Sequence, residues 1–142
     1  MAVFYDNPAL RDCWFALATE PEVRGRPVAR TLLGERLVIY TDPAGQVVAA
    51  LDRCPHREAP LSRGTMENGV LVCPYHGWSF GEQGHCVRIP SADPAMPVPR
   101  NGHLHCFHTE VRYGLVCGVP GRPAVRPAGN QPGCRRHVSS HQ

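Results

Sequence analysis

The strongest constraint on the fold of this 142-residue chain is a repeated arrangement of cysteine and histidine beside proline. Cys54-Pro55-His56 comes first, and Cys73-Pro74-Tyr75-His76 follows it. Both segments lie among turn-forming residues rather than helix formers, so the fold must bring two loops together. Two thiolates and two imidazoles gathered in this way can hold one metal ion or one small cluster.

Each Cys-Pro segment combines one cysteine with one histidine, and this mixture distinguishes a zinc site from an iron–sulfur cluster. Zinc accepts two thiolates and two imidazoles, but usually from one cysteine pair and one histidine pair, and the histidines are commonly on a helix. In a Rieske centre two cysteines hold one iron and two histidines hold the other, so each of two similar loops can supply one ligand of each kind. A chance pairing is disfavoured because both pairs begin with Cys-Pro. The pattern favours the iron–sulfur cluster, with structural zinc as the alternative.

The residues around the two pairs resemble the cluster-binding loops of Rieske non-haem iron oxygenases. The resemblance is most specific in the sequences CPHREAPLSRG, residues 54–64, and CPYHGWSF, residues 73–80. Trp14-Phe15, residues 86–90 and residues 112–116 also fit the N-terminal domain of the ring-hydroxylating or demethylating alpha subunit. The resemblance covers roughly residues 10 to 119, and its outlying pieces are supportive only.

This resemblance implies a Rieske [2Fe–2S] cluster and a route for single electrons. The implied ligands of the cluster are Cys54, His56, Cys73 and His76. Arg57 and Trp78 are expected to shield the cluster, or alternatively to fix the loops. In the family, electrons come from an NAD(P)H-driven reductase of flavin or ferredoxin type, and they pass to mononuclear Fe(II) in a catalytic domain. No catalytic residue is expected in this chain itself.

The loops also indicate the reduction potential. High-potential Rieske proteins of respiratory complexes carry a disulfide between the loops and hydroxyl groups that donate to the cluster, and here other side chains occupy these places. They are Ala59, Tyr75, Trp78 and Phe80. A low-potential centre is therefore predicted. The loop backbone is expected to be shaped by Pro55, Pro74, Gly64 and Gly77.

Periodicity predicts an all-β fold. Short segments rich in β-branched and aromatic residues alternate with Gly and Pro turns, and helical periodicity is essentially absent. The expected strands span residues 13–17, 28–33, 36–41, 46–51, 69–72, 85–89 and 104–119. We expect an antiparallel β sandwich or partly open barrel. The resemblance adds a small two-loop cluster-binding subdomain, and together these form a Rieske domain over residues 1–119.

Residues 120–142 differ in composition from the rest of the chain. They are rich in Pro, Gly and Arg, and Val125 and Val138 are their only large aliphatics, so a disordered tail is expected. The D-x2-H-x4-H pattern that supplies the mononuclear iron site of the oxygenase family does not occur. One hypothesis is a truncated or frame-shifted oxygenase, and the alternative is a genuine short ferredoxin that carries electrons by itself.

Charge and hydropathy exclude several classes of partner. The formal net charge is only +3, and no basic run suggests nucleic acid. No apolar stretch has membrane-spanning length, and no signal segment precedes the first strand. The expected location is therefore the cytoplasm.

The remaining cysteines and histidines have simpler interpretations. The seven cysteines are an odd number, which disfavours a disulfide framework. Buried thiols acting as small hydrophobes are expected at Cys13, Cys86, Cys106 and Cys117, and Cys134 is expected to be exposed. A strand would point His103 and His105 to one face and His108 to the other, so these three are expected to be surface histidines rather than a metal site. His85 shows no partner pattern.

Overall fold

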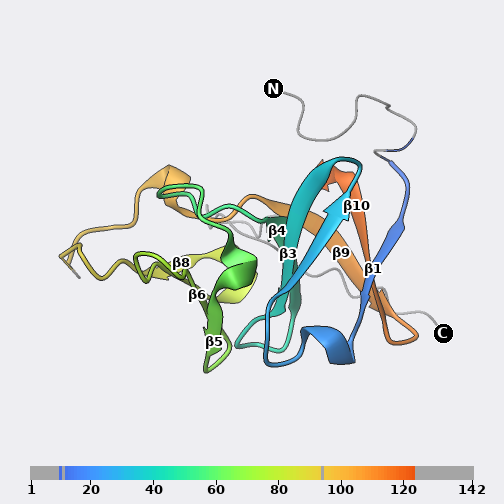
Figure 1. Ribbon diagram of the computed structural model, residues 1–142, viewed down its shortest axis with the longest axis horizontal. Helices are drawn as coiled ribbons and strands as arrows, with labels where there is room; N and C mark the ends of the chain where they lie inside the picture. Colours follow the sequence, from blue (N-terminus) through green and yellow to red (C-terminus); the bar gives the residue numbers. More distant parts are fainter. Residues whose placement is uncertain (1–9, 11, 94, 124–142) are drawn as a thin grey trace.

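The chain folds into two antiparallel sheets with only short 3-10 helices between the strands (Figure 1). The computed structural model describes residues 10, 12–93 and 95–123. The all-β fold predicted from the sequence is confirmed. In the described ranges no helix is long and apolar enough to span a membrane.

The larger sheet has six strands and curls into a partly open barrel. In spatial order the strands are β1 (Phe15–Thr19), β10 (Leu115–Pro123), β9 (Cys106–Arg112), β4 (Val47–Leu51), β3 (Glu35–Thr41) and β2 (Val28–Leu32). Strands β3 and β4 are buried on both faces, because successive side chains point to opposite faces. One face of β3 packs with Leu17 and Phe107 inside the barrel, and the other packs against the second sheet.

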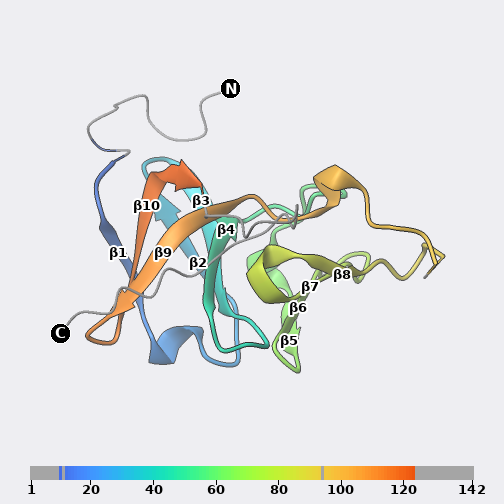
Figure 2. The same ribbon diagram turned by 180° about the vertical axis from the view of Figure 1, so that it is seen from behind.

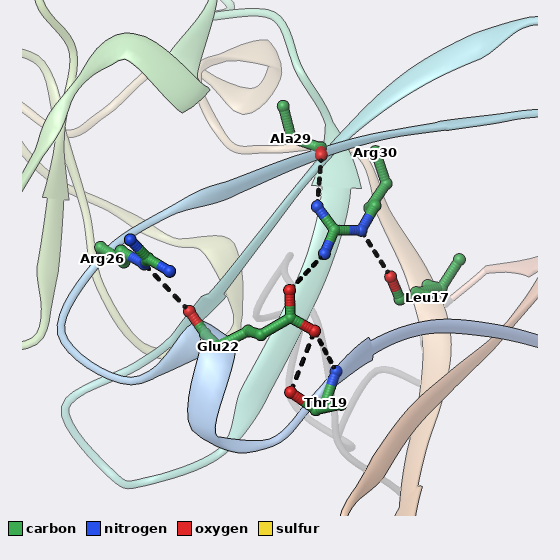
Figure 3. Close-up of polar contacts among 6 residues, drawn as sticks. All are labelled: Leu17, Thr19, Glu22, Arg26, Ala29 and Arg30. Atoms are coloured by element: carbon green, nitrogen blue, oxygen red, sulfur yellow. Dashed lines mark hydrogen bonds and ion pairs between the residues drawn. The ribbon is translucent and has the colours of Figure 1, made fainter.

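The edges of the barrel, β1 and β2, are joined by side chains (Figure 3). On β2, Arg30 donates from Nε to the carbonyl of Leu17 on β1, at 2.8 Å, and from its guanidinium to Glu22 Oε2, at 2.6 Å. Glu22 lies in the 3-10 helix η1 (Pro21–Val23), and its Oε1 accepts from the backbone N–H and the hydroxyl of Thr19. The barrel is therefore closed by an ionic bridge where strand pairing stops.

The smaller sheet is inserted between β4 and β9 and carries both cysteine loops. Its strands are β5 (Thr65–Glu67), β6 (Val70–Val72), β7 (Ser79–Phe80) and β8 (Cys86–Arg88). The first loop runs from β4 to β5 through η2 (Leu61–Arg63), and the second joins β6 to β7. Viewed from either side, this sheet lies beside the barrel at the β3–β4 hairpin (Figures 1 and 2). The two loops therefore belong to one small unit.

Polar contacts fasten this unit to the β3–β4 hairpin. The Tyr40 hydroxyl donates to the carbonyl of Gly81 at 2.9 Å. Asp42 Oδ2 accepts from the N–H of Gln83, in η3 (Glu82–Gly84), at 3.2 Å, and its Oδ1 caps the turn of the hairpin. Burial raises the pKa of Asp42 above the usual value for a carboxyl group. The smaller sheet is thus held through buried oxygen atoms as well as through the shared core.

Several details differ from the expected strands. The predicted single strand over residues 104–119 is a hairpin, because Tyr113 and Gly114 adopt positive φ angles of 52° and 75° and reverse the chain. The last strand continues to Pro123, and the predicted tail beyond it lies outside the described residues. The tail prediction, with Cys134 in it, therefore stays untested.

The cysteine predictions are only partly right. Cys86 is a buried free thiol, as expected. Cys13 is exposed because it precedes β1 instead of lying within a strand, and Cys117 is half-buried. Cys106 is buried but disulfide-bonded, so the prediction of a free thiol is wrong there.

Candidate metal centre

The first cysteine loop is closed by two backbone hydrogen bonds. The N–H of Cys54 donates to the carbonyl of Ala59 at 2.9 Å, and the N–H of Glu58 donates to the carbonyl of Cys54 at 2.7 Å. Glu58, four residues after the cysteine, has a left-handed φ of 56°. This conformation turns the chain back so that His56 lies at the exposed tip.

The second loop repeats the same closure. The N–H of Cys73 donates to the carbonyl of Trp78 at 2.8 Å, and the N–H of Gly77 donates to the carbonyl of Cys73 at 3.2 Å. Gly77 again stands four residues after the cysteine, with a φ of 70°. The two loops therefore share one backbone design, although the histidine comes two residues after the cysteine in the first and three in the second.

The structure brings the four predicted ligands together as two pairs. Cys54 and Cys73 are only 2% and 3% exposed, and their thiols interact. Burial, with a further contribution from Cys73, raises the pKa of Cys54 to about 12. His56 and His76 are exposed, and their ring centroids are 4.9 Å apart at an interplanar angle of 82°. The thiol pair is therefore buried, and the imidazole pair lies at the protein surface.

The electrostatics of the four donors indicate which ligand a site of this kind can take. A buried thiol with a raised pKa loses its proton only if a cation supplies the compensating charge. The pKa of His56 is lowered by desolvation, by His76 and by Arg57, which favours the neutral imidazole that metals bind. Two pairs of donors fit a two-iron cluster, one pair to each iron.

Trp78 and Arg57 lie differently around the histidines. The indole of Trp78 is 9% exposed and stacks on the ring of His56, with centroids 4.9 Å apart and planes 8° apart. Arg57 is exposed, and it acts on His56 through its charge. Trp78 therefore covers one face of a candidate ligand, whereas Arg57 lies at the surface beside it.

Sequence reasoning missed the residue that holds the far end of the first loop. Asp52 is buried, and its carboxylate accepts from the Ser62 N–H at 2.7 Å and from the Ser62 hydroxyl at 2.6 Å. Arg36 adds an ion pair at 3.5 Å from Asp52 Oδ2. The available signal was an acidic residue two positions before the ligand Cys54, at the end of an apolar strand. Asp52 fixes the loop between its cysteine and Gly64.

The three histidines of the H-x-H-x2-H segment do not converge. His105 is exposed, as predicted. His103 is half-buried, and its Nδ1 accepts from the N–H of Cys86 at 3.0 Å. His108 is buried with its ring 5.4 Å from that of Trp14, so the prediction of a surface histidine is wrong there. The reason is that β9 lies within the six-stranded sheet and Trp14 covers it.

Comparison with known proteins identifies the family of the chain. A family model described as "Rieske [2Fe-2S] domain" matches residues 13–132. The chain is 41% identical over 128 residues to the oxygenase component of dicamba O-demethylase from Stenotrophomonas maltophilia, covering 89% of this chain and 37% of that protein. It is 45% identical over 120 residues to the 3-chlorobenzoate-3,4-dioxygenase oxygenase subunit from Comamonas testosteroni, covering 83% and 28% respectively.

Solved structures give the same result. The crystal structure of dicamba monooxygenase superposes with a TM-score of 0.73 at 39% identity, covering 86% of this chain and 37% of that one. NdmA from Pseudomonas putida CBB5 superposes with a TM-score of 0.69 at 37% identity, covering 78% and 34%. The chain therefore spans about a third of the length of these relatives.

Proposed function

The chain belongs to the Rieske [2Fe–2S] domain family, and from that premise we propose that Cys54 and Cys73 hold one iron while His56 and His76 hold the other. The single observation that carries this assignment is the division of the donors into a buried thiol pair and an exposed imidazole pair, presented by two loops with the same closure. A cluster of this type, when bound, accepts and releases one electron at a time.

The residues around the ligands prepare the site for this role. The apolar surroundings of Cys54 and Cys73 exclude water from the thiolate side. The exposed rings of His56 and His76 provide a short path from the site to the protein surface. Trp78 holds His56 in one orientation by stacking on it. Electrons would therefore enter and leave across the imidazole face.

We infer the partners from the relatives. The similar proteins are oxygenase components, of which this chain spans about a third. We propose that an NAD(P)H-driven reductase of flavin or ferredoxin type supplies the electrons, and that mononuclear Fe(II) in an oxygenase catalytic domain receives them for ring hydroxylation or demethylation. We also propose a cytoplasmic location and a domain that ends with β10 at Pro123 instead of at residue 119, followed by a tail that extends to residue 142. In the ferredoxin alternative, the chain carries the electrons as a separate protein.

Metal analysis tests the ligand assignment directly. The chain, purified without oxygen, should be red-brown and contain about two iron and two sulfide ions per chain. Pulsed EPR of the reduced protein should show coupling to two histidine nitrogens. Cys73→Ser and His76→Ala should each lose the cluster, whereas the matched variants Cys117→Ser and His105→Ala should keep it. A colourless protein with one zinc per chain would instead establish the zinc-stabilised binding module.

A second experiment tests the electron donor. NADH and a purified reductase of each class are mixed with the cluster-loaded chain in a stopped-flow instrument, and bleaching of the cluster is followed. Reduction that depends on the reductase supports the proposal. A loaded cluster that dithionite reduces but neither class of reductase reduces would contradict the proposed partner and leave the ligand assignment intact.

A further inference from the structure

A long excursion of the chain passes beside the candidate cluster site. The excursion, of which residues 89–93 and 95–102 are described, leaves β8 and returns to β9 through η4 (Arg100–Gly102). It forms one wall of a groove of about 650 Å³ whose lining includes Trp78, Arg88 and Val98. A Cβ on Gly102 would lie 3.5 Å from the ring of Trp78, so the excursion also supports the indole that stacks on His56.

Apolar contacts hold the excursion to the rest of the molecule, since Ile89 and Val98 pack against the core cluster that includes Trp78. Its hydrogen bonds, as far as the structure describes the segment, join residues of the segment to one another: Ala92 to Ile89, Ala95 and Met96 to Asp93, and Gly102 to Pro99. The return to the smaller sheet is made just beyond it. There Cys86 N–H donates to His103 Nδ1 at 3.0 Å, and Leu104 N–H donates to the carbonyl of Gly84 at 3.0 Å.

Two imidazoles meet at this return. The rings of His85 and His103 have centroids 5.3 Å apart. Nδ1 of His103 must be unprotonated to accept from Cys86, so the neutral ring carries its proton on Nε2. His85 Nε2 is buried without a hydrogen-bond partner. A proton on either ring would therefore break a hydrogen bond or place charge in a site that cannot solvate it.

Few other groups act on the pair. Glu82 in η3 is the acid that favours protonation of His85, and the carboxylate of Asp42 binds the neighbouring Gln83. On the neighbouring elements, the titratable or charged groups are the Cys86 thiol and Arg88 of β8, Arg100 of η4, the exposed His105 just before β9, and the disulfide-bonded Cys106 at its start. The pKa of each ring is lowered, chiefly by desolvation, and that of His103 also by His85.

We propose that His85 and His103 form a pH-sensitive latch, which holds the described residues of the excursion, 89–93 and 95–102, against the smaller sheet when both rings are neutral and releases them when the rings take up protons. The release leaves the barrel and the cysteine loops folded, because these are held by their own strand pairing and loop closure. The latch thereby controls how firmly the wall beside Trp78 is held.

The direction of the pH effect follows from linkage. Both histidines bind protons less readily in the closed state than in an opened one, so closure weakens as the pH falls below the ordinary histidine range. Each ring can change the opening equilibrium by up to about tenfold per pH unit, and the two together by up to about a hundredfold. Above that range the equilibrium between the closed and opened states should be independent of pH.

Hydrogen–deuterium exchange, read by mass spectrometry, tests the latch in the cluster-loaded protein. The measurements run from pH 7.5 to pH 5.5, a range chosen to span about the ordinary histidine pKa. Each exchange rate is divided by the intrinsic rate at that pH. Between pH 7.5 and pH 5.5, protection of peptides containing Cys86 and Leu104 should fall by up to about tenfold for each ring, while protection of the β3–β4 hairpin stays constant. Loss of the cluster would be recognised separately, because it would expose the peptides of the two cysteine loops and bleach the absorbance.

Variants decide whether the histidines are responsible. In His103→Asn, Oδ1 takes the place of Nδ1 and can still accept from Cys86, but it does not titrate, so the fall in protection across this pH range should become smaller by up to about tenfold. His105→Asn is the matched control and should keep the wild-type profile. Constant protection in the wild-type protein, or an unchanged profile in His103→Asn, would overturn the proposal.

Discussion

Replacement of Gly64 by alanine should separate the two cysteine loops. Gly64 ends η2 in the first loop, and its N–H donates to the carbonyl of Leu61 at 2.9 Å. A Cβ at this position would lie 2.1 Å from the carbonyl oxygen of Val72, which directly precedes Cys73, and 3.0 Å from that of Leu61. The added methyl group would thus be caught between backbone atoms of both loops, and no rotamer change can relieve the contact.

The magnitude follows from the size of the overlap. The contact with Val72 is about 1.3 Å shorter than the 3.4 Å at which ordinary contact begins. Overpacking in a well-packed site typically costs about 1–3 kcal/mol, and more when the neighbours cannot move. We expect a loss of about 3 kcal/mol or more, which is a large part of the roughly 5–15 kcal/mol that stabilises a domain. The pairing of β5 with β6 begins at this point, so the cluster site should open as well.

The assay compares iron content and the apparent midpoint of thermal unfolding, measured at one scan rate. For Gly64→Ala we expect little bound iron and a midpoint lower by roughly 10 °C or more, at about 4 °C per kcal/mol. The matched control is Gly25→Ala, where the added Cβ meets nothing within 4 Å and only the left-handed φ of 75° is unfavourable, at about 1–2 kcal/mol. A Gly64→Ala protein with wild-type iron content and a wild-type midpoint would refute the argument from close packing.

Four further predictions follow. Trp78→Ala should cost about 3 kcal/mol and move the cluster potential in the positive direction, measured by redox titration, because water reaches the uncovered His56. Burial raises the pKa of Asp42, so the wild-type protein should lose stability as the pH rises just above the ordinary carboxyl pKa. Asp42→Asn should remove this loss, which denaturant titrations at several pH values measure. Arg30→Met should lower the free energy of unfolding by about 1 kcal/mol, because the bond to the Leu17 carbonyl is lost from a partly exposed site. The midpoint potential of the wild-type cluster should lie nearer about −150 mV than +300 mV, and a value near the upper limit would contradict it.

The sequence predicted the elements whose signal is local. The Cys-Pro pairs and the Gly and Pro turns located both loops, and in the structure the two thiols interact with each other and the two imidazole rings lie edge to face. Enrichment in β-branched and aromatic residues on either side of a turn predicted β3 and β4, and both faces of these strands are buried. Their core contacts divide between the barrel and the smaller sheet, which only the tertiary fold determines.

What the sequence did not reveal depends on contacts between distant residues. Asp52 reaches Ser62 across ten positions, and Arg30 reaches Leu17 across thirteen. The reversal was missed because Tyr113, a bulky residue, adopts a positive φ that is unfavourable in isolation, and the pairing of Arg112 with Leu115 across the turn is visible only in the fold. The roles of these residues can be assigned only once the tertiary structure is known.

The two loops differ at equivalent positions, and this difference makes the imidazole pair asymmetric. The residue that closes each loop, five positions after the cysteine, is Ala59 in the first and Trp78 in the second. Only the second loop therefore supplies an indole, and it stacks on the histidine of the other loop, His56. Among the ring contacts of the described residues, His76 makes only the edge contact with His56. A protein that approaches this surface therefore meets an uncovered face on His76, while His56 is held between two rings.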